Sequence, residues 1–248
     1  MSLLPWAGPS VAGDALRAFS VADVPSDGAA ANPWFSTRYL RDNTDTILTA
    51  LGEHVTLTVQ AVLIAALVAL PLAVVGYWVR PLAGPILALS GALYTIPSLA
   101  LLAFLAPLLG FTSDRPVLTA LVLYALVLIV RNALAGLEQV PAEVRDAAQG
   151  MGYDRLTRLT RIDLPLALPG ILTGLRLATV STVALVTVGA LIGHGGLGNL
   201  ILGGFRNNFY RAEILTGTVL CVALALILDL LLTLLGRLLT PWTRRRAA

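Results

Sequence analysis

The 248-residue sequence has no lysine, one cysteine and two histidines. Without lysine, the chain cannot carry the G-x-x-x-x-G-K-[ST] motif that holds the phosphates of ATP. Cys221 is the only cysteine, which excludes a disulfide framework and a cysteine-based metal site within one chain. His54 and His194 stand 140 positions apart, outside any Ser/His/Asp grouping. We therefore predict no catalytic residues, no metal site and no cofactor in this chain.

Charge is also scarce. Charged residues make up 12% of the sequence, about half the roughly 25% of a soluble domain. Hydrophobic residues make up 57%, and the mean hydropathy is +0.82. This composition excludes a disordered chain, and a soluble globule built from it would aggregate. The net charge of +3 does not indicate nucleic-acid binding. The sequence predicts an all-α integral membrane protein in contact with lipid.

Five apolar stretches are long enough to cross a bilayer, which takes about 20 residues. They cover residues 54–79, 85–109, 116–137, 166–192 and 212–235. The second stretch contains Pro97 and is interpreted as one tilted, kinked span, with two short re-entrant segments as the alternative. The sequence thus predicts a multi-pass protein of a cell (inner) membrane with five transmembrane helices.

The arginines indicate the orientation of these spans. Ten lie on the side that holds Arg80, residues 131–161 and the C-terminal tail, against six on the other side. Since basic residues are retained in the cytoplasm, we expect the N-terminus outside and the C-terminus inside. Residues 1–45 are interpreted as a flexible extracytoplasmic tail without a recognisable signal peptide. Residues 46–240 form the predicted transmembrane domain, and residues 241–248 a basic cytoplasmic tail.

The predicted cytoplasmic loop, residues 138–165, has the features of a short helix. Glu143 and Asp146 favour a helix N-terminus, and Ala147 and Ala148 are strong helix formers. Gly150 and Gly152 would end this helix, and Pro165 would end a second amphipathic segment over residues 154–162. A helix that exposes small residues below the membrane is typical of a surface that fits a partner's groove.

This loop resembles that of the permease subunits of ATP-binding-cassette (ABC) importers. In that family the loop has the form E-A-A, then three residues, then G, then nine residues, then I-x-L-P. The matching residues are Asp146, Ala147, Ala148, Gly152, Ile162, Leu164 and Pro165. Asp146 replaces Glu, which keeps the charge but shortens its reach. The resemblance implies the type I ABC importer permease fold and an ATPase dimer that docks at the loop and binds ATP and Mg. It also implies an extracytoplasmic substrate-binding protein and a second permease subunit, identical or paralogous.

Further motifs resemble osmoprotectant permeases over residues 45–236. These are the run 94–102, residues 129–132, residues 164–169 and Gly195-Gly196-Leu197-Gly198, where His194 replaces a usual small residue. The resemblance implies transport of glycine betaine, choline or carnitine, with methionine or another small solute as the alternative. A secondary transporter is a weaker interpretation, because no inverted repeat is visible. Aromatic residues are only 6% and do not cluster, so selective recognition is assigned to the external binding protein.

Candidate residues of the translocation path follow from interrupted helices. Pro97 interrupts the second stretch between the hydroxyls of Thr95 and Ser98, although the break could serve packing alone. Asn132 follows Arg131, an expected interface anchor, at the inner end of the third span. The glycines after the fourth span are interpreted as a tight turn or as an outer gate. They are Gly193, Gly195, Gly196 and Gly198.

Two charges fall deep inside predicted spans, away from their ends. Arg176 lies about ten residues into the fourth span, and Asp229 lies eight residues before Arg237. At ~1.5 Å per residue, both are roughly 12–15 Å from the cytoplasmic surface. Because charges within a membrane are costly and usually paired, we predict an Arg176–Asp229 ion pair that holds the two spans together. The alternative is that the pair acts as a gate or relay.

Overall fold

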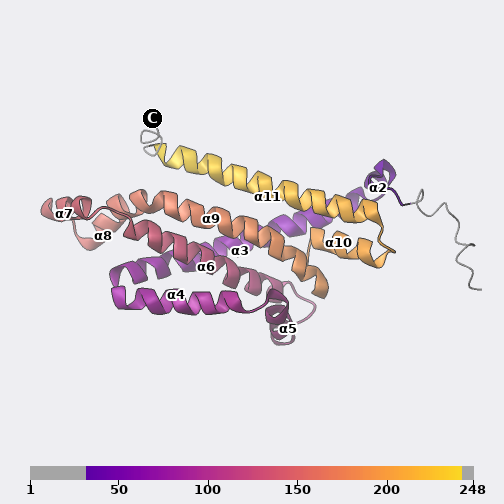
Figure 1. The fold of residues 1–248 in the computed structure, drawn as a ribbon, viewed down its shortest axis with the longest axis horizontal. Coiled ribbons are helices and arrows are strands. Elements are labelled where there is room, and N and C mark those ends of the chain that lie inside the picture. Colours follow the sequence, from indigo (N-terminus) through magenta and orange to yellow (C-terminus); the bar gives the residue numbers. More distant parts are fainter. Residues whose placement is uncertain (1–31, 242–248) are drawn as a thin grey trace, which may run out of the picture.

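The computed structural model describes residues 32–241. Its regular elements in that range are all helical (Figure 1). They are α2 (Thr37–Asp42), α3 (Thr44–Trp78), α4 (Arg80–Thr95), α5 (Ser98–Leu109), α6 (Arg115–Glu138), α7 (Ala142–Gly150), α8 (Arg155–Arg158), the π-helical turn η3 (Leu159–Asp163), α9 (Leu164–Val186), the 3₁₀-helix η4 (Thr187–Ile192), α10 (Leu197–Arg206) and α11 (Arg211–Leu239). The helices form an elongated bundle with α7 and α8 projecting at one end, the α7 end, and α2, α5 and α10 at the other, the α10 end.

Four helical segments of the described chain are long and apolar enough to cross a membrane. They are α3, α6, the continuous stretch Arg155–Ile192 and α11. The α4–α5 pair supplies a fifth crossing if its two halves count together, but they meet at an angle of 91°. The expected span over 85–109 is therefore two helices, because Ile96 is extended and Pro97, which has no N–H, starts a new helix. The bend is much sharper than the kink that we predicted.

The core lies where α6 packs between α3 and α9. Ala61, Ala65 and Ala69 recur every fourth residue of α3 and are fully buried on one face. Gly170 of α9 comes so close to α6 that an added Cβ would lie 2.8 Å from the Cα of Gly136. Small residues let membrane helices approach closely, since lipid offers no hydrophobic force to press them together. These alanines and glycines therefore set the spacing of the three central helices.

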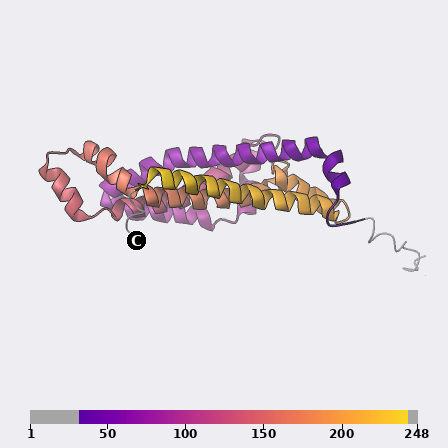
Figure 2. The ribbon, with the colours of Figure 1, turned by 90° about the horizontal axis from the view of Figure 1, so that it is seen from above.

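Helix α11 lies at the side of the bundle, along α9 and α10 (Figures 1 and 2). Only 6% of its most apolar window is buried inside the chain. Leu230, Leu231 and Leu238 are more than half exposed. In a membrane protein such a face contacts lipid or another apolar helix.

The segment before α3 is helical in part. Ser36 caps α2 by accepting a hydrogen bond from the Tyr39 N–H at 3.2 Å. The buried Tyr39 ring meets the edge of Tyr210 at 5.4 Å, and burial raises the pKa of Tyr39 to about 12. Residues 37–42, part of the predicted tail, thus form a helix that is held by a contact with Tyr210, far along the chain. Residues 1–31 and 242–248 lie outside the described residues.

Candidate coupling loop and translocation path

Helix α7 has the character expected for the loop. Glu143 is in its first turn, and the side chains of Glu143, Asp146 and Ala147 are exposed, whereas Ala148 is fully buried. The helix ends at Gly150, and Gly152 follows with φ +83, a conformation that favours glycine. The predicted small-residue face is therefore exposed only in part, at Ala147 and Gly150, because Ala148 packs inward; the helix lies at the tip of the molecule (Figure 1).

The second half of the loop continues into the fourth span without a break. Asp154 caps α8 by accepting from the Leu156 N–H at 3.3 Å. Residues 155–192 are then helical throughout, so the prediction that Pro165 ends the segment is wrong. Pro165 lies in the first turn of α9, just after the π-helical turn η3. The missing proline N–H is tolerated there, because the hydrogen-bond pattern changes at the π turn.

The motif residues Ile162, Leu164 and Pro165 lie at the junction between loop and bundle rather than on the exposed face. All three are half-buried, and Leu164 packs with Leu159 and Ala167. Their position indicates that they anchor the loop to the bundle. Helix α7 and the exposed residues after it, Met151 and Leu156 among them, are then left to face a partner.

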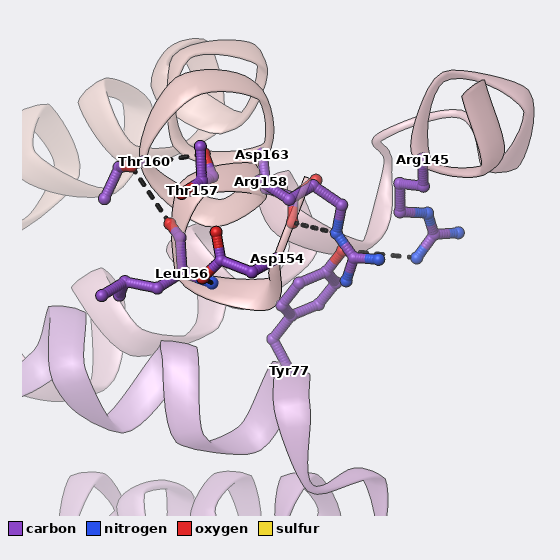
Figure 3. A network of polar contacts seen from close by, with 8 residues as sticks. All are labelled: Tyr77, Arg145, Asp154, Leu156, Thr157, Arg158, Thr160 and Asp163. Atoms are coloured by element: carbon purple, nitrogen blue, oxygen red, sulfur yellow. Dashed lines mark hydrogen bonds and ion pairs between the residues drawn. The ribbon is translucent and has the colours of Figure 1, made fainter. Parts of the chain in front are cut away.

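Asp163, between these motif residues, is a functional candidate that our sequence reasoning missed. It is fully buried, and its Oδ2 accepts from the Arg158 Nε at 3.4 Å, while its Oδ1 has no hydrogen-bond partner within the described chain (Figure 3). A buried carboxylate is costly without a charged partner, so Arg158 is held beside Asp163. The available signal was a lone acidic residue between two apolar motif positions.

Arg176 and Asp229 form the predicted ion pair between α9 and α11. The Arg176 Nε donates to Asp229 Oδ1 at 2.8 Å, and Nη2 donates to Oδ2 at 2.9 Å. This bidentate geometry is the strongest form of an arginine–carboxylate contact. The two side chains are 41% and 31% exposed, toward a groove of about 400 Å³ that Thr173 and Leu226 also line.

The glycines after the fourth span form a tight turn at the α10 end. Gly193 ends η4 with φ +86, and Gly196 has φ +50. A Cβ on Gly196 would lie 2.7 Å from His54 Cβ, and one on Gly198 would lie 2.6 Å from Thr187 Cα. Gly195 is pressed against the Ala190 backbone in the same way. The predicted tight turn is present, and its glycines are required by close approach to neighbouring backbone.

His54 holds this turn, a role that our sequence analysis did not identify. It is fully buried on α3, and its Nδ1 accepts a hydrogen bond from the Leu197 N–H at 3.3 Å. Its Nε2 lies 3.1 Å from the Val183 carbonyl and therefore carries the proton and donates. One neutral imidazole thus ties α3 to both α9 and the start of α10.

The remaining path candidates do not form a single cluster. Ser98 lines a small cavity with Tyr124, whose hydroxyl donates to the Ile96 carbonyl at 2.5 Å. The exposed Thr95 donates to the carbonyl of Ala92 in its own helix at 2.7 Å.

Asn132 lies apart from that cavity, in the seam between α6 and α9. Its amide nitrogen donates to the Leu128 carbonyl at 2.8 Å, and its Cβ lies against Gly174. Arg131, its neighbour, is exposed, as expected for an interface anchor. Asn132 therefore serves helix packing in this structure.

The membrane-length helices define a multi-pass membrane protein, with a short helix projecting at one end and a glycine turn at the other. Residues 61–245 match the family described as the binding-protein-dependent transport system inner membrane component, and the chain belongs to that family. Membership implies in general an ATPase partner and a substrate-binding protein.

Characterised relatives cover most of the chain. A choline transport system permease, OpuBB of Bacillus subtilis, is 36% identical over 205 residues, which is 82% of this chain and 93% of the relative. The osmoprotectant import permease OsmW of Salmonella typhimurium is 36% identical over 207 residues, 82% of this chain and 96% of the relative. The glycine betaine/carnitine/choline permease OpuCB of Bacillus subtilis is 34% identical.

The fold is that of a type I ABC importer permease. A chain of the inward-facing MetNI methionine ABC transporter superimposes with a TM-score of 0.73, covering 79% of this chain and 97% of that one. At 21% identity the likeness extends to the fold alone.

Proposed function

We propose that this chain is the permease subunit of an ATP-driven importer and forms half of the translocation path for an osmoprotectant such as choline, glycine betaine or carnitine. The observation that carries the proposal is helix α7, which exposes Glu143 and Ala147 beyond the membrane-length helices while Ala148 anchors it. The relatives named for choline and osmoprotectants share 34–36% identity with this chain, against 21% for the methionine system. That difference favours an osmoprotectant over methionine.

In this proposal the α7 end lies in the cytoplasm, as the arginine bias indicates. A separate ATPase dimer binds ATP and Mg and docks against α7, and this chain catalyses nothing itself. A second permease subunit completes the path, and an extracytoplasmic binding protein delivers the solute at the α10 end. Closure of the ATPase would move α7 and rock the helices above it between inward- and outward-facing states.

The break at Pro97 and the turn at Gly193–Gly198 are proposed as elements of the path and its outer gate. The break and the turn are joined through the small cavity between Ser98, Tyr124 and Val188, since Val188 belongs to η4, which leads into the turn. A movement at the Pro97 break would therefore shift the glycine turn, and a movement of the turn would shift the break. The Arg176–Asp229 pair is proposed as a lock between α9 and α11.

The substrate is tested in cells that lack osmoprotectant uptake, supplied with this chain and its partner subunits. We expect uptake of labelled choline, glycine betaine or carnitine at high salt, and none when ATP is depleted. Uptake of methionine alone would replace the substrate assignment. Uptake that persists without the ATPase would indicate a secondary transporter and contradict the proposal.

The role of α7 is tested with Gly152→Leu. Leucine is strained at φ +83, so the backbone after α7 would change direction. The leucine side chain itself would not clash, because no atom lies within 4 Å of the site. We expect the variant to insert normally but to hydrolyse ATP without transport. Gly52→Leu, which also has open space around it but sits in α3, is the matched control. Normal uptake in Gly152→Leu would contradict the coupling role.

A further inference from the structure

A strongly basic pocket lies at the α7 end, between the α3–α4 turn and α7–α8. Its volume is about 400 Å³, and four arginines line it: Arg80, Arg145, Arg155 and Arg158. They come from three separate helices, α4, α7 and α8, which the fold brings together. Figure 3 shows Arg145 and Arg158 reaching toward Tyr77 from two sides, with the Arg145 Nη1 donating to the Tyr77 hydroxyl at 3.4 Å.

This positive charge is only partly balanced within the described chain. Asp154 is the only acidic residue that lines the pocket, and its carboxylate already caps α8. Arg158 is paired with Asp163. Within residues 32–241, no carboxylate lies within ion-pair distance of Arg80, Arg145 or Arg155. Three guanidinium groups without a carboxylate partner, one of them hydrogen-bonded to Tyr77, therefore surround one cavity and form a site for an anion.

The position of the pocket indicates where that anion comes from. Tyr77 and Trp78 line it and form the end of the apolar helix α3. Tyrosine and tryptophan at such a position lie at the level of the lipid headgroups. Arg80 follows two residues later and is exposed, as is Trp78 at 39%. The pocket is therefore at headgroup depth and accessible to lipid.

The pocket is also distinct from the proposed docking face of α7. Arg145 and Gln149 are four residues apart and line the pocket together. Glu143, Ala147 and Gly150 share a different face of the same helix, about 145° away at 100° per residue. An occupant of the pocket would leave that face free for a partner protein.

We propose that this pocket binds the phosphate of an anionic phospholipid headgroup, such as that of phosphatidylglycerol. Arginine forks match phosphate oxygens in pairs and hold them more firmly than a point charge does. Basic pockets between membrane helices at the cytoplasmic surface bind anionic headgroups in this way. A bound headgroup would brace α7 against the α3–α4 turn. The proposal concerns lipid and is independent of the transported solute.

The test uses the full-length chain purified in neutral detergent, with phosphatidylglycerol as the probe and retained lipid measured by native mass spectrometry. In Arg80→Gln/Arg145→Gln we expect the affinity for phosphatidylglycerol to fall about thirty-fold, the effect of removing two arginines near an anionic headgroup. The matched control Arg115→Gln/Arg206→Gln removes the same charge from exposed positions elsewhere and should bind as the wild type does. Size-exclusion elution shows whether each variant is folded.

Should the double glutamine variant fail to elute as a single species, Arg80→Lys/Arg145→Lys replaces it. That variant keeps the charge but loses the two-pronged guanidinium geometry, and we expect a loss of affinity smaller than the roughly thirty-fold loss of the glutamine variant. Equal binding of phosphatidylcholine, or displacement of the lipid by inorganic phosphate, would overturn the lipid assignment. Loss of ATPase co-purification with unchanged lipid binding would also overturn it, since the arginines would then serve the protein partner.

Discussion

The Arg176–Asp229 pair permits a quantitative prediction about the membrane bundle. It is the bidentate contact that joins α11 to α9, at 2.8 and 2.9 Å. Removing one partner of a desolvated pair costs about 3–5 kcal/mol, because the other charge is left unpaired. An unpaired charge inside a membrane span costs about 2.5–3.5 kcal/mol once it can shift toward the interface, so we expect a loss of about 2–3 kcal/mol for Asp229→Ala or Arg176→Ala.

For a chain of this length, that loss corresponds to a fall in melting temperature of about 4–12 °C. The assay is thermal denaturation in detergent, followed by size-exclusion chromatography of the remaining folded protein. The charge swap Arg176→Asp/Asp229→Arg should recover most of the lost stability, and Arg176→Met/Asp229→Leu should be close to the wild type. Single variants that melt within 1–2 °C of the wild type, or a swap that is no more stable than they are, would refute the reasoning.

Two further substitutions test the packing of the helices. His54→Ala leaves the Leu197 N–H and the Val183 carbonyl unpaired in the interior, so we expect a loss of about 2–4 kcal/mol in thermal unfolding. His194→Ala should change stability by under about 0.5 kcal/mol, and similar losses in both would contradict the role of His54. Gly170→Ala should separate α6 from α9 and lower the melting temperature, because its Cβ would lie 2.8 Å from Gly136 Cα. Gly91→Ala has open space and should be neutral or stabilising, so equal effects of the two alanines would argue against close packing.

The apolar spans and the loop could be predicted because their signals are local. Span length and hydropathy are properties of continuous segments, and the helix formers and glycines around α7 act on their immediate neighbours. The ion pair was also predictable, since Arg176 and Asp229 lie at equal depth in neighbouring spans and a membrane penalises unpaired charge. Each of these inferences used only the composition of one segment or the depth of a charge in the membrane.

The remaining features depend on contacts between segments distant in sequence. His54 bonds to backbone 129 and 143 residues away, so its own neighbours give no indication of its role. The 91° bend at Pro97 is set by how α5 packs on α6 and η4, which composition does not encode. Pro165 is a helix breaker by rule, yet the preceding π turn accommodates it. Asp163 and the basic pocket likewise become visible only when α3, α4 and the loop are placed together.

The central claim, that an ATPase docks on the exposed face of α7, is tested most directly by site-specific cross-linking. Cys221 is the only cysteine and is buried, so Cys221→Ser provides a background free of other thiols. In that background, Ala147→Cys places a photo-cross-linker on the proposed docking face, and Gln149→Cys places it on the pocket face of the same helix. In the assembled transporter we predict a strong cross-link to the ATPase from position 147 and a much weaker one from position 149. No ATPase cross-link from position 147, or equal yields from the two positions, would contradict the account.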